Sequence, residues 1–129
     1  MSAKIHKDMN IEKVDIIIPL PLHIRRLYER GYNQSYLLAR EIGSTFSKEV
    51  VTDLLIKIKN TKPQSSLSGR ERRINLKNAF AVHDPEKIAG KNILLIDDIM
   101  TTGTTLTEAS KVLIKAKVKS VACAVAARA

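Results

Sequence analysis

Apolar residues in this chain occur either as short continuous runs or as segments with a helical period. Three runs are continuous and rich in β-branched or small apolar residues, which is typical of strands buried on both faces of a sheet. They occupy residues 14–21 (VDIIIPLP), 92–97 (NILLID) and 118–127 (VKSVACAVAA). The first strand is expected to end at Pro19 and Pro21, because proline cannot donate to a strand ladder.

Two segments have apolar residues every three or four positions, which predicts helices with one buried face. The first runs from Tyr32 to about Phe46 and carries Leu38 and Ile42. Lysines near the end of the second helix suit the negative pole of its dipole. The apolar positions of this second helix are Leu106, Ala109, Leu113 and Ala116.

The middle of the chain is less regular. Residues 50–59 (VVTDLLIKIK) alternate in their second half, which suits a strand near the edge of a sheet. Residues 60–70 (NTKPQSSLSGR) are polar and have no period, which predicts a mobile loop. Ser68, with Glu71 three residues later, has the pattern of a capping box that opens a short helix.

The order strand, helix, strand, loop, strand, helix, strand predicts an α/β fold with a mostly parallel, twisted sheet flanked by helices. With 129 residues, 44% of them hydrophobic and 27% charged, the chain is expected to form one globular domain. No apolar run approaches the roughly 18–20 residues that span a membrane. Residues 1–13 are polar and lack an apolar signal region. We therefore expect a cytoplasmic protein that does not associate with membranes.

The single cysteine, Cys123, lies in an apolar run and is expected to be a core residue. One cysteine cannot form an internal disulfide, and without a CxxC pair a structural zinc site is not expected.

The formal net charge of +9 is unevenly distributed. Between Lys57 and Lys77 there are seven Lys or Arg residues and one acid, and a second basic group follows the first predicted strand. Such a field attracts phosphates, either on nucleic acid or on small molecules. A well-solvated surface explains the charge equally well, so both interpretations stay open.

An uncharged loop follows two adjacent carboxylates in the segment LLIDDIMTTGTTLTEAS, which starts at Leu94. Asp97 and Asp98 close a predicted parallel strand, and ligands bind beyond the carboxyl ends of such strands. The amides of the following strand-to-helix turn suit a phosphate, and carboxylates suit hydroxyl groups or a metal ion. A ribose 5-phosphate carries both kinds of group. The loop residues concerned are Thr101, Thr102, Gly103, Thr104 and Thr105.

Each part of this segment also has a purely structural interpretation. Thr105 and Glu108 match a capping box, and the two acids match ordinary turn residues. Other phosphate-binding folds are excluded by spacing, because neither GxxxxGK[ST] nor GxGxxG occurs. A response-regulator receiver needs an aspartate well downstream of its acidic pair, and no aspartate follows Asp98.

The segment ILLIDDIMTTGTTL resembles the motif of type I phosphoribosyltransferases that binds 5-phosphoribosyl 1-diphosphate (PRPP). Two further segments, IIIPLPLHIRRLYERGYNQSYLLA and QSSLSGRERRINLKNAF, resemble the ComF family of competence-related proteins. The resemblance implies a type I phosphoribosyltransferase-like core over residues 14–129, preceded by the polar segment 1–13.

The resemblance also implies roles for particular residues. Asp97 and Asp98 would contact the ribose hydroxyls and, with Arg72, form the catalytic set. Mg²⁺ would accompany PRPP, and the same two acids are its candidate ligands. The threonine-glycine loop would bind the 5-phosphate.

Pyrophosphate leaves with high negative charge, so cationic groups must neutralise it. We expect residues 19–31 to form a loop that holds it, with Arg26 a less firm candidate than the others. The polar loop 61–73 would close over the site as a flexible lid. The candidates are His23, Arg25, Arg30, Gly31, Asn33 and Gln34 for pyrophosphate, and Gln64, Arg70, Arg73 and Asn75 for the lid.

Two function classes remain open at this stage. The first is an enzyme that transfers phosphoribose from PRPP to a nitrogenous acceptor. The second, suggested by the ComF resemblance, is a non-catalytic protein that binds single-stranded DNA or a protein partner during DNA uptake. Full-length ComF proteins usually begin with a cysteine-rich zinc module, which this sequence lacks, so we expect the phosphoribosyltransferase core alone. An exposed last strand would allow a homodimer.

Overall fold

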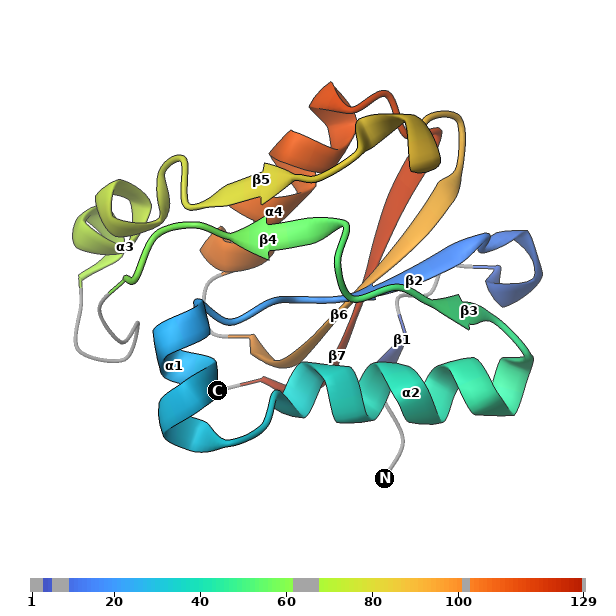
Figure 1. Ribbon diagram of the computed structural model, residues 1–129, viewed down its shortest axis with the longest axis horizontal. Helices are drawn as coiled ribbons and strands as arrows, with labels where there is room; N and C mark the ends of the chain where they lie inside the picture. The colour runs from blue at the N-terminus through green and yellow to red at the C-terminus, as the bar shows by residue number, and fades with distance from the viewer. Residues whose placement is uncertain (1–3, 6–9, 62–67, 101–102, 129) are drawn as a thin grey trace.

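The computed structural model describes residues 4–5, 10–61, 68–100 and 103–128 (Figure 1). For residues 4–5, 72–73, 99–100 and 127–128 it describes the backbone alone. The described residues form strands, α-helices and 3₁₀ helices (η) in the order β1 Lys4–Ile5, η1 Ile11–Lys13, β2 Ile16–Pro19, α1 Ile24–Arg30, α2 Gln34–Phe46, β3 Glu49–Val50, β4 Leu55–Lys57, α3 Gly69–Leu76, β5 Phe80–Val82, η3 Pro85–Lys87, β6 Asn92–Met100, α4 Thr104–Lys115 and β7 Ser120–Arg128.

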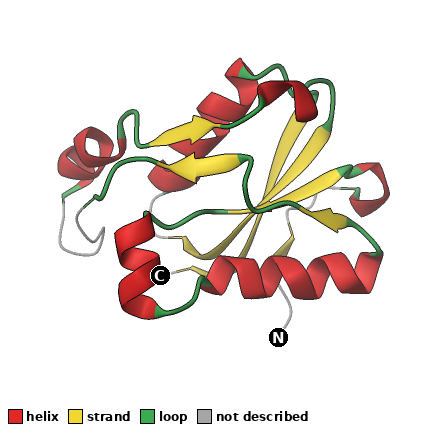
Figure 2. Ribbon diagram, viewed as in Figure 1, coloured by secondary structure: helices red, strands yellow, loops and turns green. Residues whose placement is uncertain are grey.

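The main sheet has five strands in the order β1-β7-β6-β2-β3. Strands β3, β2, β6 and β7 run parallel, and β1 is antiparallel to β7. The predicted α/β fold with a mostly parallel sheet is therefore confirmed. β4 and β5 form a separate antiparallel pair on one side of this sheet (Figure 2).

Two hydrophobic clusters fill the space on opposite faces of the sheet. Alternate side chains of the central strand point to opposite faces. Ile93 and Leu95 of β6 belong to the cluster that also holds α4 and the β4–β5 pair. Leu94 and Ile96 belong to the cluster under α2. The continuous apolar runs of the sequence are explained by this burial on both faces.

Gly43 brings α2 close to β3. A Cβ atom at this position would lie 2.5 Å from Cγ2 of Val50 and 2.9 Å from the carbonyl oxygen of Lys48. Glycine inside a helix costs about 1 kcal/mol relative to alanine. The close packing of α2 on the sheet edge explains why glycine is present there.

The predicted helices α2 and α4 are confirmed, and α4 buries three of its four predicted apolar positions. The capping box that opens α3 is also confirmed. The Glu71 amide donates to Ser68 Oγ at 3.2 Å, and the Ser68 amide donates to Glu71 Oε1 at 3.3 Å. None of the helices in the described part of the chain is long and apolar enough to cross a bilayer.

Several element boundaries differ from the prediction. Residues 24–30, expected within a loop, form helix α1. This helix has seven residues, so its few apolar positions are not enough to establish a period. The segment 50–59, expected as one strand, is divided between β3 of the main sheet and β4 of the second one. β5 was not predicted, because a strand of three residues is too short to establish a period.

The last strand is not an exposed edge along its whole length. β1 pairs with β7 at Lys4↔Val125 and Ile5↔Ala124. The expectation of an open edge on β7 is therefore wrong over these residues, and dimerisation through that edge loses its basis there.

Candidate functional site

The candidate site lies where β2 stops and its neighbour β6 continues. β2 pairs with β6 as far as Pro19↔Ile96, and the Leu20 amide then donates to the Ile96 carbonyl at 2.7 Å. β6 extends to Met100 alongside β7. This difference in length leaves a crevice at the carboxyl ends of the strands, the usual place for ligands in open α/β sheets.

Asp97 and Asp98 lie inside β6 and not in a turn after it. Asp97 pairs in register with Val125 of β7, so the interpretation of the acids as turn residues is wrong. The strand continues past them because β7 also continues, to Arg128. Asp97 is 7% exposed, and Asp98 is half-buried.

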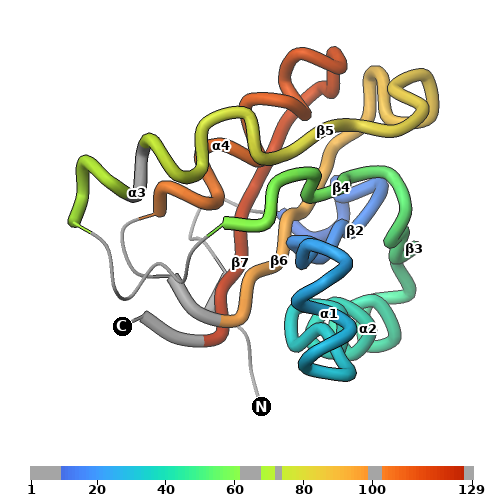
Figure 3. The backbone as a smooth tube through the Cα atoms, turned by 60° about the vertical axis from the view of Figure 1, so that its left-hand side comes forward, coloured from blue at the N-terminus to red at the C-terminus, as the bar shows by residue number. Residues whose placement is uncertain are grey.

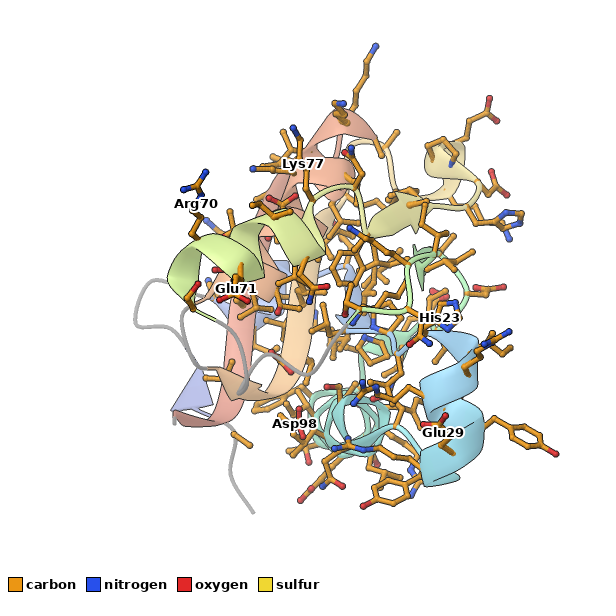
Figure 4. All side chains as sticks on the ribbon, turned by 90° about the vertical axis from the view of Figure 1, so that its left-hand side faces the viewer. His23, Glu29, Arg70, Glu71, Lys77 and Asp98 are labelled. Carbon is orange, nitrogen blue, oxygen red and sulfur yellow. The ribbon has the colours of Figure 1, made fainter. Side chains whose placement is uncertain are left out.

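Because adjacent strand residues point to opposite faces, the two acids belong to different layers. Asp97 continues the side of Ile93 and Leu95, toward α4 and the β4–β5 pair. Asp98 continues the opposite side, toward α2, and Figure 4 shows it beside that helix. Both nevertheless line one pocket of about 180 Å³, because β2 is absent at this level.

The start of α4 supplies the predicted phosphate-binding side of the site. Gly103 is the N-cap, with φ 80° in the left-handed region, and it has no side chain with which to cap the helix. Thr105 lines the same pocket as the acids. The proposed capping box starting at Thr105 is wrong, because the helix already begins at Thr104 and Glu108 pairs with Lys111 at 3.0 Å. Thr101 and Thr102 lie outside the described residues.

Asn33 fixes the third wall of the pocket. It is the N-cap of α2, where its Oδ1 accepts from the Ser35 amide at 3.0 Å. Its Nδ2 donates to the Leu20 carbonyl at 3.2 Å, which ties the start of α2 to the end of β2. Gln34 and Arg30 line the pocket beside it. The structure thus brings these three predicted residues together with the acidic pair.

Two cations line the pocket in addition to Arg30. Arg26, a less firm candidate from sequence, lines it and donates from Nη2 to the carbonyl of buried Thr61 at 3.4 Å. Lys57 of β4 also lines it and was missed. The signal was present in the alternation of β4, because Leu55 is buried and Lys57 shares its face.

The surroundings of Lys57 lower the pKa of its side chain. Burial and then the charge of Arg26 lower the pKa of Lys57, while Asp97 opposes that shift. Its Nζ lies 5.9 Å from the ring centroid of Phe80 on the neighbouring strand. A lysine held this way, close to both an arginine and a carboxylate, is a frequent feature of binding sites.

The structure places the other candidates away from this pocket. His23 is the N-cap of α1, and its Nδ1 accepts from the Arg25 amide at 3.2 Å. Gly31 is the C-cap of α1 with φ 81°. His23 and Gly31 line a neighbouring groove, and Arg25 is exposed and lines neither cavity.

The predicted lid residues are only partly described. Arg70 of α3 is exposed and does not line the pocket, and Figure 4 shows its side chain pointing away from Asp98. Asn75 is half-buried on the same helix and does not line the pocket. Gln64 and the side chains of Arg72 and Arg73 lie outside the described part of the chain. Their predicted roles stay predictions.

The described residues contain no group of three or more His, Cys, Asp or Glu placed to hold a metal ion. Mg²⁺ commonly takes only one or two carboxylates from the protein and its remaining ligands from substrate phosphates and water. The Asp97–Asp98 pair therefore fits an ion that arrives with an anionic ligand better than a resident one.

Comparison with known proteins gives a consistent picture. The profile described as phosphoribosyl transferase domain matches residues 29–129. Competence protein F of Haemophilus influenzae is 37% identical over 108 residues, 83% of this chain and 47% of that protein. DNA utilization protein YhgH of Escherichia coli K12 is 35% identical over 78% of this chain and 44% of its own length. Competence protein ComFC of Bacillus subtilis is 34% identical over 92% of this chain and 45% of its own length.

The chain therefore spans about half the length of these curated relatives. The solved structure of the allosteric regulatory enzyme of purine biosynthesis aligns with 87% of this chain and 22% of its own, at a TM-score of 0.55 and 16% identity. At that identity the likeness shows the fold alone, and it confirms the predicted phosphoribosyltransferase-like core.

Proposed function

We propose that this chain, which belongs to the phosphoribosyl transferase domain family, binds PRPP with Mg²⁺ in the pocket between β2, β6 and α4. ComF-type proteins are among its relatives, as the sequence predicts. The observation that carries the proposal is the composition of this one pocket. Its described lining joins two carboxylates and the first turn of a helix that begins after a glycine N-cap with cations from three other positions.

Each part of PRPP has a matching group in this arrangement. The carboxylates of Asp97 and Asp98 accept hydrogen bonds from the ribose 2- and 3-hydroxyls. The amides at the start of α4 and the Thr105 hydroxyl donate to the 5-phosphate. Arg26 and Arg30 face the pyrophosphate, whose charge they neutralise together with Lys57.

Asp97 and Asp98 would hold Mg²⁺, which would supply positive charge against the leaving group. The protein residues position the sugar and exclude water from its anomeric carbon. In a transfer reaction, the bond from that carbon to the pyrophosphate oxygen breaks and a bond to an acceptor nitrogen forms. The acceptor nitrogen gives up its proton, and pyrophosphate leaves as the anion.

Calorimetric titration with Mg-PRPP tests the binding proposal. We expect saturable binding by the chain and a loss of roughly tenfold or more in affinity for Asp98→Asn, which removes a charged acceptor. Asp53→Asn is the matched control, because Asp53 is an exposed carboxylate in the β3–β4 connection. Absence of binding at millimolar ligand, or an equal loss in the control, contradicts the proposal. Release of pyrophosphate with a nitrogenous acceptor tests transfer separately.

A role in handling DNA is the second candidate, favoured by the names of the relatives and by the net charge of +9. In this alternative the domain binds single-stranded DNA or a partner and transfers nothing. Affinity for an oligonucleotide should then fall steeply with salt, because phosphate contacts release counterions. An affinity that does not change between low and physiological salt would exclude this role. The cytoplasmic location stays a prediction.

A further inference from the structure

A second, larger cavity of about 1020 Å³ adjoins the candidate site. It shares Pro21, Leu22, Asn33 and Lys57 with the polar pocket but is otherwise built differently. Its walls come from α1, the first turns of α2 and strand β4. Figures 1 and 3 both place α1 and α2 on the same side of β4. We call this cavity the apolar groove.

The walls of the apolar groove are exposed aliphatic and aromatic side chains. Six large apolar residues that line it are between 37% and 74% exposed: Ile24, Leu27, Tyr32, Leu37, Ile56 and Ile58. Single exposed apolar residues are ordinary, but a contiguous group on one surface marks an interaction site.

Helix α1 is an independent indication that something covers this groove. It has seven residues and buries none of them. Helices this short are marginal in water, and in proteins they are stabilised by packing an apolar face. Ile24 and Leu27 are three residues apart and therefore on one face, and both line the groove. Ile24 is 74% exposed and Leu27 is 38% exposed, so the described residues cover this face only in part.

The charges of the groove indicate the chemistry of its occupant. Its described lining includes Arg40 and Lys57 and contains no Asp or Glu. Arg40 lies at 5.8 Å from the ring centroid of Tyr36, which holds its charge at the wall of the groove. An apolar surface with cations and no carboxylates is complementary to an apolar segment that carries acidic residues.

Other occupants fit less well. A second copy of this chain would bring another net charge of +9 to a cationic surface. Nucleic acid needs several phosphate contacts and stacking surfaces, whereas these walls are largely aliphatic. A small molecule is normally enclosed over most of its surface, and these wall residues are too exposed to enclose one.

We propose that the apolar groove between α1, α2 and β4 is a docking site for an amphipathic, acidic helix of a partner protein. The apolar face of that helix would pack on Leu27, Leu37 and Ile58, in the manner of helix-in-groove recognition. Its carboxylates would pair with Arg40 and, at the junction with the polar pocket, with Lys57. Docking in the groove does not require PRPP, but both ligands would use Lys57 and would compete for it.

Fluorescence anisotropy with a labelled synthetic peptide tests the proposal. The probe is a peptide of about 14 residues, roughly four helical turns, with leucines on one face and glutamates on the other. The control peptide has the same composition in scrambled order, so it keeps the charge and loses the apolar face. We expect the amphipathic peptide to bind at least roughly tenfold more tightly, since burial of a few leucines supplies more than that factor.

Matched variants locate the binding. Ile58→Glu and Arg40→Glu should each weaken the amphipathic peptide by roughly tenfold or more. Ile114→Glu changes an apolar residue on α4 with a similar exposure, 63% against 59%, and Lys119→Glu makes the same charge change elsewhere. Both controls should stay within about twofold of the unchanged chain.

Three results would overturn the proposal: equal binding of the scrambled peptide, equal loss in the control variants, or binding of a single-stranded oligonucleotide with the same variant sensitivity. Concentration-dependent self-association that Ile58→Glu abolishes would instead identify a second copy as the occupant and also overturn it. Mg-PRPP titration of Ile58→Glu should match the unchanged chain, so failure of PRPP binding and failure of peptide docking are separate results.

Discussion

Replacing Lys57 by methionine removes a positive charge from the candidate site while preserving the length and much of the volume of its side chain. Among the described residues, the pocket lining has three cations, Arg26, Arg30 and Lys57, and two carboxylates. With all five groups charged, this described lining has a net charge of +1, and Lys57→Met lowers it to zero. A ligand that carries pyrophosphate meets a neutral pocket in the variant and a positive one in the unchanged chain.

The expected loss of affinity follows from the kind of contact removed. A hydrogen bond to a charged group contributes about 1.5–3 kcal/mol, which corresponds to a Kd roughly 10- to 150-fold higher. Titration calorimetry with Mg-PRPP and with inorganic pyrophosphate measures this directly. Lys59→Met is the matched control, because Lys59 is two residues away, exposed, and lines neither cavity.

The pH dependence provides a second readout. Burial, followed by the charge of Arg26, lowers the pKa of Lys57 below its usual range. Lys57 therefore loses its charge at a lower pH than an ordinary lysine, and affinity for the anion should fall as pH rises through that pKa. Lys57→Arg keeps its charge and should lose this fall. Equal affinity in Lys57→Met and the unchanged chain, or an identical pH profile in Lys57→Arg, would refute the reasoning.

The free energy of unfolding of the ligand-free chain should rise with pH, whereas the affinity for the anion should fall. Below both pKa values, folded and unfolded states each carry the proton, and the folded state bears the cost of the buried charge. Because the folded-state pKa of Lys57 is the lower one, the unfolded chain binds more protons between the two values, and stability rises with pH there. Lys57→Met should therefore unfold in urea at the same or higher concentration than the unchanged chain at neutral pH.

Three further predictions concern the scaffold of the site. Gly43→Ala should lower the stability of the chain in urea, although alanine has the better helix propensity, because its Cβ would lie 2.5 Å from the Val50 side chain. Gly69→Ala is the control and should be neutral or stabilising, because there is open space around that position. Asn33→Ala should cost about 1–2 kcal/mol in the same assay, because it removes the N-cap of α2 and the bond to the end of β2; no loss would contradict that role. Burial, together with Asp97, raises the pKa of the Cys123 thiol against a hydrogen bond to Ser110, so its reaction with a thiol reagent at pH 8 should be much slower than in denaturant.

The parts of the fold that could be predicted are those with a local pattern. The continuous run before Asp97 identifies a strand buried on both faces, and the threonine-glycine loop after it identifies a helix start. The predicted carboxyl end of this strand was less accurate, because the length of β6 depends on its pairing with β7, which lies later in the sequence. Helix α1 could not be predicted, because seven residues are too few to establish a period.

The candidate site shows the same division between local and long-range information. Asp97, Asp98 and Thr105 lie within nine residues and form a motif. Lys57 reaches the pocket only because β4 leaves the main sheet and pairs with β5. His23 has the right chemistry for an anion but is used as the cap of α1. Which cation faces the pocket is decided by packing, and no spacing in the sequence reports it.

The strand position of Asp97 and Asp98 has a consequence for how a ligand is received. Their backbone belongs to β6, which at this level pairs with β7 on one side, so its conformational entropy is already lost on folding. The hydroxyl-bearing end of a ligand therefore meets a rigid surface, whereas the cations opposite are long side chains with rotamers still to be restricted. Hydrogen exchange in β6 should hardly change on binding, and the ordering that accompanies binding should be concentrated in α1 and β4. In the proposed binding mode, the ribose would meet a preformed surface, and the pyrophosphate would meet side chains that adjust.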